Sequence, residues 1–337
     1  MRALAIESPG TARIVERDQP TAGMGEVLVR VARVGLCGTD LSTFMGKNPL
    51  VSYPRVIGHE IAGIVAGIGA EVDGWTIGDR VAISPYKNCG TCAACRHARP
   101  NACRNNETLG VQREGALAEF TAVPTSRLVR STRLDLDQLA LVEPFSVGMH
   151  AVQRGRVTAD DTVLVIGCGG VGAGAVAGAA GKGARVIAFD LEQQKLDLAR
   201  AFGAREAVLS TPDAAAAVLA LTNGEGPDVV IEAVGSASTY RLALELVAAC
   251  GRVVCLGWVK GDVPLEARHF VAKEMDLLGS RNALTELDDV VALFESGRID
   301  PLRLVSDRIS LEQVPDTLAR WATGTSGIGK VLVSVAD

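Results

Sequence analysis

The stretch that decides the fold is VLVIGCGGVG at residues 163–172. Its last six residues fit the pattern Gly-x-Gly-x-x-Gly, which turns a strand into a helix and presents backbone N–H groups to a phosphate. Gly167 permits the tight turn, Gly169 lets the backbone approach a pyrophosphate, and Gly172 lets helix and strand pack closely. An apolar strand leads in and a helix of small residues leads out. The sequence therefore predicts a dinucleotide-binding turn. The alternative is a glycine-rich helix–sheet contact without a ligand.

The strand that follows this turn ends in an acidic residue. Asp190 follows the predicted strand Arg185–Phe189, 18 residues after Gly172. A carboxylate at this place accepts hydrogen bonds from the ribose hydroxyls of the adenosine half of a dinucleotide. It would repel the extra phosphate of NADP, and it is followed by Leu191 and Glu192 rather than by an arginine. The sequence therefore predicts NAD rather than NADP as the cofactor.

The segments on either side of the turn are of two kinds. From about Glu143, strands alternate with helical stretches, which predicts an α/β fold with a parallel doubly wound sheet. Before about residue 130, short strands rich in β-branched residues are separated by Gly and Pro, which predicts a small all-β unit. The predicted strands are Val27–Val34, Ile61–Ile68, Arg80–Ile83, Val163–Ile166, Arg185–Phe189, Val229–Glu232, Arg252–Leu256, Leu277–Leu278 and Lys330–Val333, and the predicted helices begin at about Val171 or span Glu192–Ala201 and Leu311–Trp321.

Length and composition exclude several classes of protein. The 337 residues suffice for about two domains, and 48% apolar with 22% charged residues describe a globular chain. A net charge of −5 and few aromatic residues (7 Phe, 3 Trp and 3 Tyr) disfavour a nucleic-acid partner. The N-terminus has no signal-peptide pattern. The uncharged run Val163–Gly181 is interpreted as strand, turn and helix rather than as a membrane span. We therefore expect a cytoplasmic protein with no membrane partner.

Four of the eight cysteines lie within fifteen residues of one another: Cys89, Cys92, Cys95 and Cys103. Four thiolates with no open position are typical of a tetrahedral structural zinc site. Unligated thiols or disulfides are an alternative, although disulfide frameworks are typical of short secreted chains. An iron–sulfur cluster is another. A nucleic-acid-binding zinc knuckle is a third, because basic residues surround the thiols (Arg96, His97, Arg99 and Arg104).

A second candidate metal set is dispersed along the chain. Cys37 follows the strand that ends at Val34, His59 lies 22 residues further on, and Glu143 precedes the alternating region. A thiolate, an imidazole and a carboxylate can hold zinc with one position open for water or substrate. From chemistry alone, each of these residues could equally have a structural role.

These motifs together carry a resemblance that runs over essentially the whole chain. The chain resembles the zinc-dependent medium-chain alcohol and polyol dehydrogenases, in whose order and approximate spacing its motifs occur. These motifs are GLCGTD at residues 35–40, Gly58-His59-Glu60, GDRV at 78–81, the four-cysteine loop, Glu143-Pro144 and the glycine turn. Glu143-Pro144 and the run NPLVSYP at 48–54 are similar to the branch that contains sorbitol, threonine and sugar-acid dehydrogenases.

The resemblance implies two zinc ions per chain. Cys37 and His59 would hold a catalytic ion, and the third ligand would be Glu143, as in many relatives, or Glu60, as in some polyol dehydrogenases. The sequence leaves this choice open. The four clustered cysteines, Cys89, Cys92, Cys95 and Cys103, would hold a structural ion.

The resemblance also implies a path for the substrate proton. Thr39 matches the hydroxyl that bridges the bound alcohol to this path. Many relatives have a His five residues after the Cys, where this chain has Ser42. A serine hydroxyl can pass a proton on but cannot store one near neutral pH. The relay would therefore run through water or another group, and His150 is a candidate by sequence only, its alternative being a buried helix histidine.

The architecture implied by the resemblance has three parts. Residues 1–147 form a GroES-like β-barrel catalytic domain with a zinc lobe at about 86–105, residues 148–284 form a Rossmann dinucleotide-binding domain, and residues 285–337 return to the first domain. Relatives are dimers or tetramers, so a homo-oligomer is expected. The expected cofactor-binding residues are Gly167, Gly169, Gly170, Val171, Gly172, Asp190, Val234, Gly257 and Arg281.

The implied reaction is NAD-linked oxidation of a secondary hydroxyl of a polyol, sugar or sugar acid to a ketone. A glutamate ligand makes zinc harder than a second thiolate would, which suits an oxygen-rich substrate. Few aromatic residues are available to build an apolar slot for an alkyl group. Arg113 and Asn282 are candidates for contacts to the remaining hydroxyls or a carboxylate, with a surface arginine as the alternative for Arg113. The alternative functions are a threonine-type amino-alcohol dehydrogenase, a simple alcohol dehydrogenase, and a catalytically silent zinc- and nucleotide-binding protein.

Overall fold

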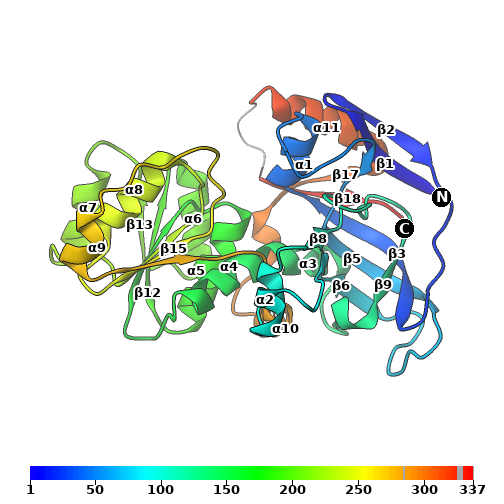
Figure 1. Cartoon of the computed structure of the whole chain (residues 1–337), viewed down its shortest axis with the longest axis horizontal. Coiled ribbons are helices and arrows are strands. Elements are labelled where there is room, and N and C mark those ends of the chain that lie inside the picture. Colours follow the sequence, from blue (N-terminus) through cyan, green and yellow to red (C-terminus); the bar gives the residue numbers. More distant parts are fainter. Residues whose placement is uncertain (284, 325–328, 337) are drawn as a thin grey trace. The chain divides into compact units, whose positions relative to one another are not determined.

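The computed structural model describes residues 1–283, 285–324 and 329–336 (Figure 1). The chain divides into two compact units. Unit 1 consists of Met1–Glu143, Leu287–Ser296 and Pro301–Asp337, and unit 2 consists of Pro144–Glu286 and Gly297–Asp300. The predicted domain limit at residue 284 lies outside the described residues. Within the described part of the chain, no helix is both long and apolar enough to cross a bilayer.

Unit 1 is built on a seven-stranded sheet. Its order is β10-β6-β5-β3-β18-β17, with β9 also paired to β3. The central strand β3 alternates buried Val27, Val29 and Val31 with half-buried residues, as a strand with one face on a core must. The strands are β3 (Glu26–Leu36), β5 (Glu60–Ile68), β6 (Arg80–Ile83), β9 (Phe120–Pro124), β10 (Leu128–Arg130), β17 (Val305–Ser310) and β18 (Lys330–Ser334).

The last strand of the chain returns to the first unit. β18 pairs antiparallel with β3, so that Val333 lies opposite Val34, and parallel with β17. Its apolar residues join the same core as those of β3 and β5. Residues nearly 300 positions apart in the sequence therefore lie side by side in one sheet.

Smaller elements complete unit 1. A three-stranded sheet has the order β2-β1-β4, and a two-stranded ladder pairs β7 with β8 beside the cysteine loop. These strands are β1 (Arg2–Ser8), β2 (Thr11–Glu16), β4 (Arg55–Val56), β7 (Tyr86–Lys87) and β8 (Glu107–Thr108). The helices are α1 (Gly38–Phe44), α2 (Ala93–Arg96), α3 (Leu136–Ala140) and α11 (Val314–Ala322), while α4 (Val142–Arg154) and α10 (Glu286–Glu295) contain the unit boundaries.

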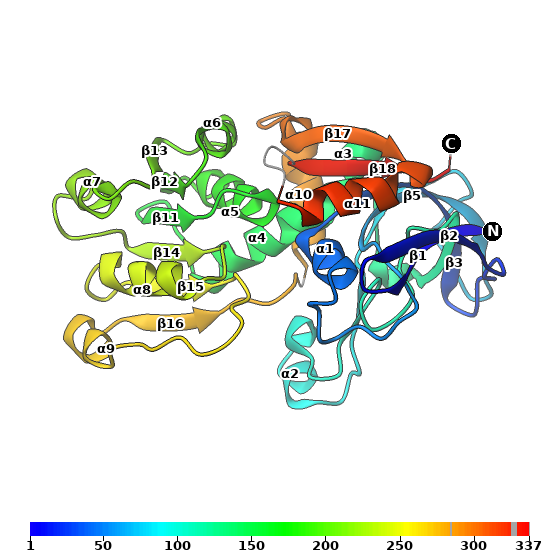
Figure 2. The ribbon, with the colours of Figure 1, turned by 90° about the horizontal axis from the view of Figure 1, so that it is seen from above.

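Unit 2 contains a six-stranded parallel sheet with the order β13-β12-β11-β14-β15-β16 (Figure 2). The strands are β11 (Thr162–Ile166), β12 (Arg185–Asp190), β13 (Glu206–Leu209), β14 (Val229–Glu232), β15 (Arg252–Cys255) and β16 (Asp276–Gly279). The helices are α5 (Gly170–Gly181), α6 (Gln193–Ala201), α7 (Ala214–Leu221), α8 (Ala237–Leu246) and α9 (Arg268–Lys273). The strand order reverses between β11 and β14, which is where doubly wound sheets bind ligands.

The fold class predicted from the sequence is confirmed, with one local difference. The uncharged run 163–181 is strand β11, a turn and helix α5, as interpreted. The expected helix Leu311–Trp321 instead begins with a 3₁₀ segment, Leu311–Gln313, and α11 starts at Val314. Pro315 explains the division, because proline has no amide hydrogen and is accommodated only in the first turn of a helix.

Candidate active site and metal centres

The four thiols predicted to bind a structural metal lie together beside α2. The Cys92 sulfur lies 3.6 Å from that of Cys95 and 3.7 Å from that of Cys103, and the sulfurs of Cys103 and Cys89 are 3.5 Å apart. A tetrahedral zinc ion with Zn–S bonds of about 2.3 Å would separate its sulfurs by about 3.8 Å. A disulfide would bring two sulfurs to about 2.05 Å. The lobe therefore has the dimensions of a four-thiolate zinc site.

Backbone N–H groups point at these sulfurs. The amide of Cys92 donates to the Cys89 sulfur and the amide of Cys89 donates to the Cys103 sulfur, each at 3.4 Å. Hydrogen bonds from Thr91 and Cys92 lower the pKa of Cys89 to about 5. Burial, together with the neighbouring thiols, raises the pKa of Cys95 to about 11. The hydrogen bonds to Cys89 thus favour its thiolate, which is the form in which cysteine binds a metal ion.

The second set is assembled by two neighbouring strands. Cys37 follows β3 and stands at the N-cap of α1, and His59 and Glu60 stand at the start of β5. One ligand atom from each of these three residues lies within 4.8 Å of the others. Gly35 makes room for the carboxylate, because a Cβ there would lie 2.0 Å from an oxygen of Glu60. The structure thus brings together three of the predicted ligands.

The surroundings of His59 are anionic. Burial lowers its pKa, but the negative charges of Asp40, Cys37 and Glu143 outweigh burial and raise the pKa of His59 well above its ordinary value. Its Nδ1 lies 3.8 Å from Asp40 Oδ1. A buried imidazole that is surrounded by a thiol and carboxylates is short of positive charge, and a divalent cation would supply it.

Asp40 had no role in the sequence prediction, although it lies in the quoted GLCGTD motif. One of its oxygens accepts a hydrogen bond from the amide of Cys37 at 2.9 Å, and the other accepts one from the amide of Gly58 at 3.1 Å. Its side chain is 1% exposed. Asp40 therefore joins the two segments that carry Cys37 and His59 through their backbone amides.

The two glutamates between which the sequence left a choice have different partners. Both oxygens of Glu60 accept hydrogen bonds from Lys330 Nζ, at 2.5 and 2.6 Å. Glu143 accepts a hydrogen bond from the Tyr86 hydroxyl, and burial raises its pKa. All four side chains are buried. Glu60 belongs to the cluster with Cys37 and His59, whereas Glu143 lies beside it.

Sequence reasoning missed both Lys330 and Tyr86. Lys330 stands at the start of β18, and its ammonium also donates to the carbonyl of Leu36 at 3.1 Å, directly before Cys37. Burial lowers the pKa of Lys330, but the charges of Glu60 and Cys37 raise it more, so its pKa is above the ordinary value. No sequence signal pointed to this pair, because 270 positions separate Lys330 from Glu60.

The residues predicted for proton transfer lie in different units. The Thr39 hydroxyl is 3.8 Å from the Cys37 sulfur, and Ser42 lies on the same helix, α1. His150 lies in unit 2, where its Nδ1 is 2.7 Å from Glu286 Oε1 and both side chains are buried. This contact agrees with the alternative of a buried helix histidine, and the relay role of His150 stays a prediction.

The glycine turn has the geometry that a dinucleotide requires. Gly167 has a φ of +91°, which favours glycine. A Cβ on Gly172 would lie 1.8 Å from the Gly167 carbonyl oxygen. A Cβ on Gly169, by contrast, would meet nothing within 4 Å, so packing inside the described protein does not require glycine there. An open position at the N-cap of α5 is the place where a pyrophosphate would approach the backbone of Gly170 and Val171.

Asp190 has an additional role that the sequence did not reveal. One of its oxygens accepts a hydrogen bond from the amide of Cys168 at 2.7 Å, and the other accepts one from the amide of Glu192 at 3.1 Å. The carboxylate therefore shapes the glycine turn. Each oxygen still has a second lone pair for a ribose hydroxyl.

The remaining predicted residues are placed less directly. Val234 and Gly257 follow strands β14 and β15 of unit 2, and Arg281 and Asn282 follow β16. Arg113 donates to the carbonyl of Pro85 at 3.3 Å. Burial lowers the pKa of Arg113, and the charges acting on it come from Glu107, Arg127 and Glu26, none of which belongs to the Cys37 set. Among the described contacts, nothing brings Arg113 to that set.

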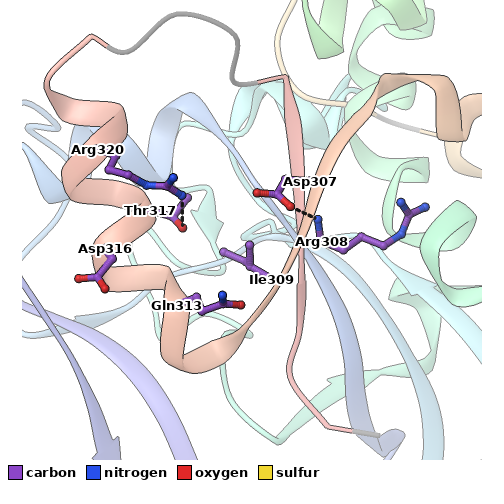
Figure 3. A pocket seen from close by; sticks show the side chains of 7 residues that line it. All are labelled: Asp307, Arg308, Ile309, Gln313, Asp316, Thr317 and Arg320. Atoms are coloured by element: carbon purple, nitrogen blue, oxygen red, sulfur yellow. Dashed lines mark hydrogen bonds between the residues drawn. The ribbon is translucent and has the colours of Figure 1, made fainter.

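A surface groove of about 450 Å³ lies elsewhere in unit 1, between β17 and α11 (Figure 3). It is lined by Asp307, Arg308, Ile309, Gln313, Asp316, Thr317 and Arg320. Its acidic and basic side chains are mixed, and Arg308 pairs with Asp137 at 2.6 Å. The predicted site residues do not line this groove, so the candidate site is defined by the side-chain clusters above.

Comparison with known families agrees with this geometry. Residues 23–133 match the alcohol dehydrogenase GroES-like domain, and residues 170–296 match the zinc-binding dehydrogenase domain. The chain belongs to the zinc-dependent medium-chain alcohol dehydrogenase family, whose members are oxidoreductases acting on CH–OH groups.

Individual relatives are similar over their whole length. L-galactonate-5-dehydrogenase of Escherichia coli K12 is 32% identical over 322 residues, which is 95% of this chain and 95% of that protein. Sorbitol dehydrogenase of Bacillus subtilis 168 is 32% identical over 341 residues, with coverages of 99% and 97%. A zinc-binding dehydrogenase of Sinorhizobium meliloti 1021, solved with NADP bound, has a TM-score of 0.91 at 32% identity and covers 99% of this chain and 98% of its own.

Proposed function

We propose that this chain is an NAD-linked zinc dehydrogenase that oxidises a secondary hydroxyl of a polyol, sugar or sugar acid to a ketone. The observation that carries the proposal is the Cys37–His59–Glu60 cluster, with half-buried Cys37 and buried His59 and Glu60, in a chain that also contains the glycine turn with Asp190. A silent zinc- and nucleotide-binding protein would not need such an anionic set, since a closed four-thiolate site suffices for structure.

The residues divide the chemical work among them. Cys37, His59 and one of the two glutamates hold the catalytic ion, and Asp40 orients the segments that carry the first two. A zinc ion held there would supply Lewis-acid chemistry that lowers the pKa of the substrate hydroxyl, and NAD would supply the hydride acceptor. Glu60 is the glutamate that the geometry favours for contact with the cluster, and Glu143 lies within electrostatic reach.

The hydroxyl proton leaves through Thr39 in this proposal. Thr39 lies beside Cys37 and its hydroxyl can both accept and donate a proton. Ser42, one turn further along α1, would pass the proton to water. Neither hydroxyl stores a proton near neutral pH, so the last acceptor in this proposal is solvent.

The second ion is structural. Cys89, Cys92, Cys95 and Cys103 would supply all four ligands of a tetrahedral zinc ion and leave no position for a substrate. This set would fix the loop between β7 and β8. Tyr86, which donates to Glu143, belongs to β7, so an ordered lobe also supports the carboxylate that lies beside the active-site cluster.

The substrate class follows from the relatives and from the ligand set. Two relatives are named for a sugar acid and a polyol, and a glutamate ligand suits an oxygen-rich substrate. Asn282 and Arg281 follow β16 in the cofactor-binding unit and are proposed as contacts to cofactor or substrate. Arg113 is retained as a carboxylate contact only as a hypothesis, since its described contacts lie elsewhere.

We also propose a cytoplasmic homo-oligomer with the domain limits predicted from the sequence. β16 is an edge strand of the unit 2 sheet. Most of its residues are exposed, and the apolar Leu277 is 39% exposed. An exposed edge with an apolar side chain suits pairing with a second copy. Thiols that must stay reduced to bind zinc are consistent with the cytoplasm.

The proposal is tested by following absorbance at 340 nm with zinc-loaded enzyme and NAD. L-galactonate and other aldonates, sorbitol, threonine and ethanol are compared by kcat/KM under one condition. We expect an aldonate or a polyol to give the highest value. Threonine as the best substrate would move the function to amino alcohols, and ethanol or a longer alkyl alcohol would refute the proposal. Elemental analysis should find two zinc ions per chain.

A further inference from the structure

A buried carboxylate that the proposed reaction does not use stands at the carboxyl end of β14. Glu232 is the last residue of that strand and is 0% exposed. Its Oε1 accepts three hydrogen bonds: from the amides of Val234 and Gly235 at 2.9 Å each, and from the Thr239 hydroxyl at 2.8 Å. One oxygen atom thus fixes the turn after β14 and the first turn of α8.

The backbone of the same residue holds a second turn. The carbonyl of Glu232 accepts hydrogen bonds from the amides of Leu256 and Gly257, both at 2.9 Å. These two residues follow β15. Glu232 is therefore the common partner of the turns after β14 and after β15, through its side chain and its carbonyl respectively.

The two turns are in backbone contact. A Cβ on Gly235, whose φ is +78°, would lie 2.8 Å from the amide nitrogen of Trp258. A Cβ on Gly257 would lie 2.1 Å from the amide nitrogen of Gly235 and 2.8 Å from Glu232 Oε2. Glycine at both positions and the carboxylate behind them form one tightly packed arrangement.

The second carboxylate oxygen adds an independent observation. Glu232 Oε2 is buried and has no hydrogen-bond partner among the described residues. A buried acceptor without a partner costs free energy, so stability alone does not favour an acid at this place. The shape that Oε1 imposes on the turn after β14, which packs against the turn after β15, is the compensating gain that we infer.

The position of these turns relates them to one half of a dinucleotide. The strand order of unit 2 reverses between β11 and β14, and doubly wound sheets bind dinucleotides across that point. β11 and β12 carry the glycine turn and Asp190, which suit the adenosine half. β14 and β15 lie on the other side of the reversal. Val234 adjoins the pyrophosphate turn, because a Cβ on Gly167 would lie 2.6 Å from its Cγ2.

We propose that Glu232 is a positioning residue for the nicotinamide half of the dinucleotide. It holds the Val234 turn and the Gly257 turn in the shape that receives this half, and it contacts neither substrate nor cofactor itself. The inference rests on the proposed dinucleotide site of unit 2.

The test separates the two halves of the cofactor. Calorimetric titration of the zinc-loaded full-length enzyme measures Kd for NAD and for AMP, which carries only the adenosine half. For Glu232→Ala we expect the Kd for NAD to rise about tenfold, the size expected when hydrogen bonds to a buried charged group are lost. The Kd for AMP should stay within about twofold of wild type, because Asp190 and the glycine turn are unchanged.

Three further variants serve as controls. Glu232→Gln keeps an acceptor at Oε1 and should keep the Kd for NAD within about threefold. Thr239→Val removes one of the three donors to Oε1 and should raise the Kd for NAD about threefold without changing the Kd for AMP. If Glu232→Ala does not fold, the Thr239→Val result alone tests the inference. Asp161→Ala removes a buried acid that pairs with Arg252 at the amino ends of β11 and β15. It should lower the melting temperature without changing either Kd.

Two results would overturn the inference: equal weakening of NAD and AMP by the Glu232 and Thr239 variants, or unchanged NAD binding in both. Neither result would contradict the proposal that the wild-type chain binds a dinucleotide. If wild type bound neither NAD nor AMP, the proposed function would fail instead.

Discussion

The four-cysteine lobe and the Cys37 cluster are two sets of metal-ligand side chains in one unit, yet they are built in opposite ways. The lobe takes all its ligands from residues 89–103, and backbone amides of the same loop support the sulfurs. The Cys37 cluster takes its ligands from two strands, and its charge is matched by Lys330 at the other end of the chain. A local set serves structure, because it can form without the rest of the domain. A set that needs the completed sheet is present only in the folded enzyme.

The largest expected effect comes from Cys37→Ala. We expect it to remove one zinc ion and lower kcat/KM about a thousandfold or more, because a Lewis acid is worth several kcal/mol in the transition state. Melting temperature should be little changed. Zinc content, kinetics and thermal unfolding measure the three. Cys250→Ser, at an exposed cysteine outside both sets, is the matched control, and full activity with one zinc in Cys37→Ala would contradict the assignment.

Cys92→Ala tests the other metal set, the four-cysteine lobe. The lobe has four ligands and no spare one, so we expect loss of the other zinc ion and a fall of about 3 kcal/mol or more in the free energy of unfolding. Activity should decline mainly through loss of folded protein. Denaturant unfolding with zinc analysis measures this, and an unchanged zinc content would show that these thiols are not its ligands.

Asp40→Asn probes the support of the dispersed set. An amide oxygen can still accept one backbone hydrogen bond, but the negative charge beside His59 is lost. We expect zinc affinity at this site to fall by about 10- to 100-fold while the lobe ion is retained. Competition with a chelator resolves the two ions, and equal loss of both would argue against a separate role for Asp40.

Asp190→Ala extends the comparison to unit 2, where a local motif is again completed by a neighbouring strand. We expect the KM for NAD to rise, because a partner of the ribose hydroxyls is removed. We also expect the ratio of kcat/KM for NAD to that for NADP to fall about tenfold, because the carboxylate no longer repels the extra phosphate of NADP. The measurement is kcat/KM with each cofactor. Because one relative was solved with NADP bound, the cofactor preference of the wild-type protein is also a test. A kcat/KM for NADP equal to or higher than that for NAD would contradict the role of Asp190.

Ser42→Ala is expected to have the smallest effect, a decrease of a few fold in kcat, since water can replace a hydroxyl in a proton path. Ser42→His should leave the fold intact and raise turnover near neutral pH. The pH profile of kcat decides the question. If Ser42→Ala has the wild-type profile throughout, this hydroxyl lies outside the proton path.

The elements that the sequence predicted correctly are those with local signals. The turn at residues 163–172, the run from Val163 to Gly181 and the cysteine lobe each depend on neighbours in the chain, and the structure places them as expected. The helix predicted at Leu311–Trp321 differs at its start, where a 3₁₀ segment precedes α11 because of Pro315. Lys330 and Tyr86 gave no such signal, because their partners, Glu60 and Glu143, are far away in the sequence.

The sequence by itself determined the class of fold, the local zinc lobe and the family, because spacing along the chain is sufficient to specify a tight turn or a loop of four ligands. Only the tertiary structure distinguished Glu60 from Glu143 by their partners. A lysine at the start of β18 meets the first glutamate and a tyrosine of β7 meets the second. The physical reason is that the charge balance of a buried site is set by whichever side chains the completed sheet brings together, and sheet pairing joins residues at any separation in sequence.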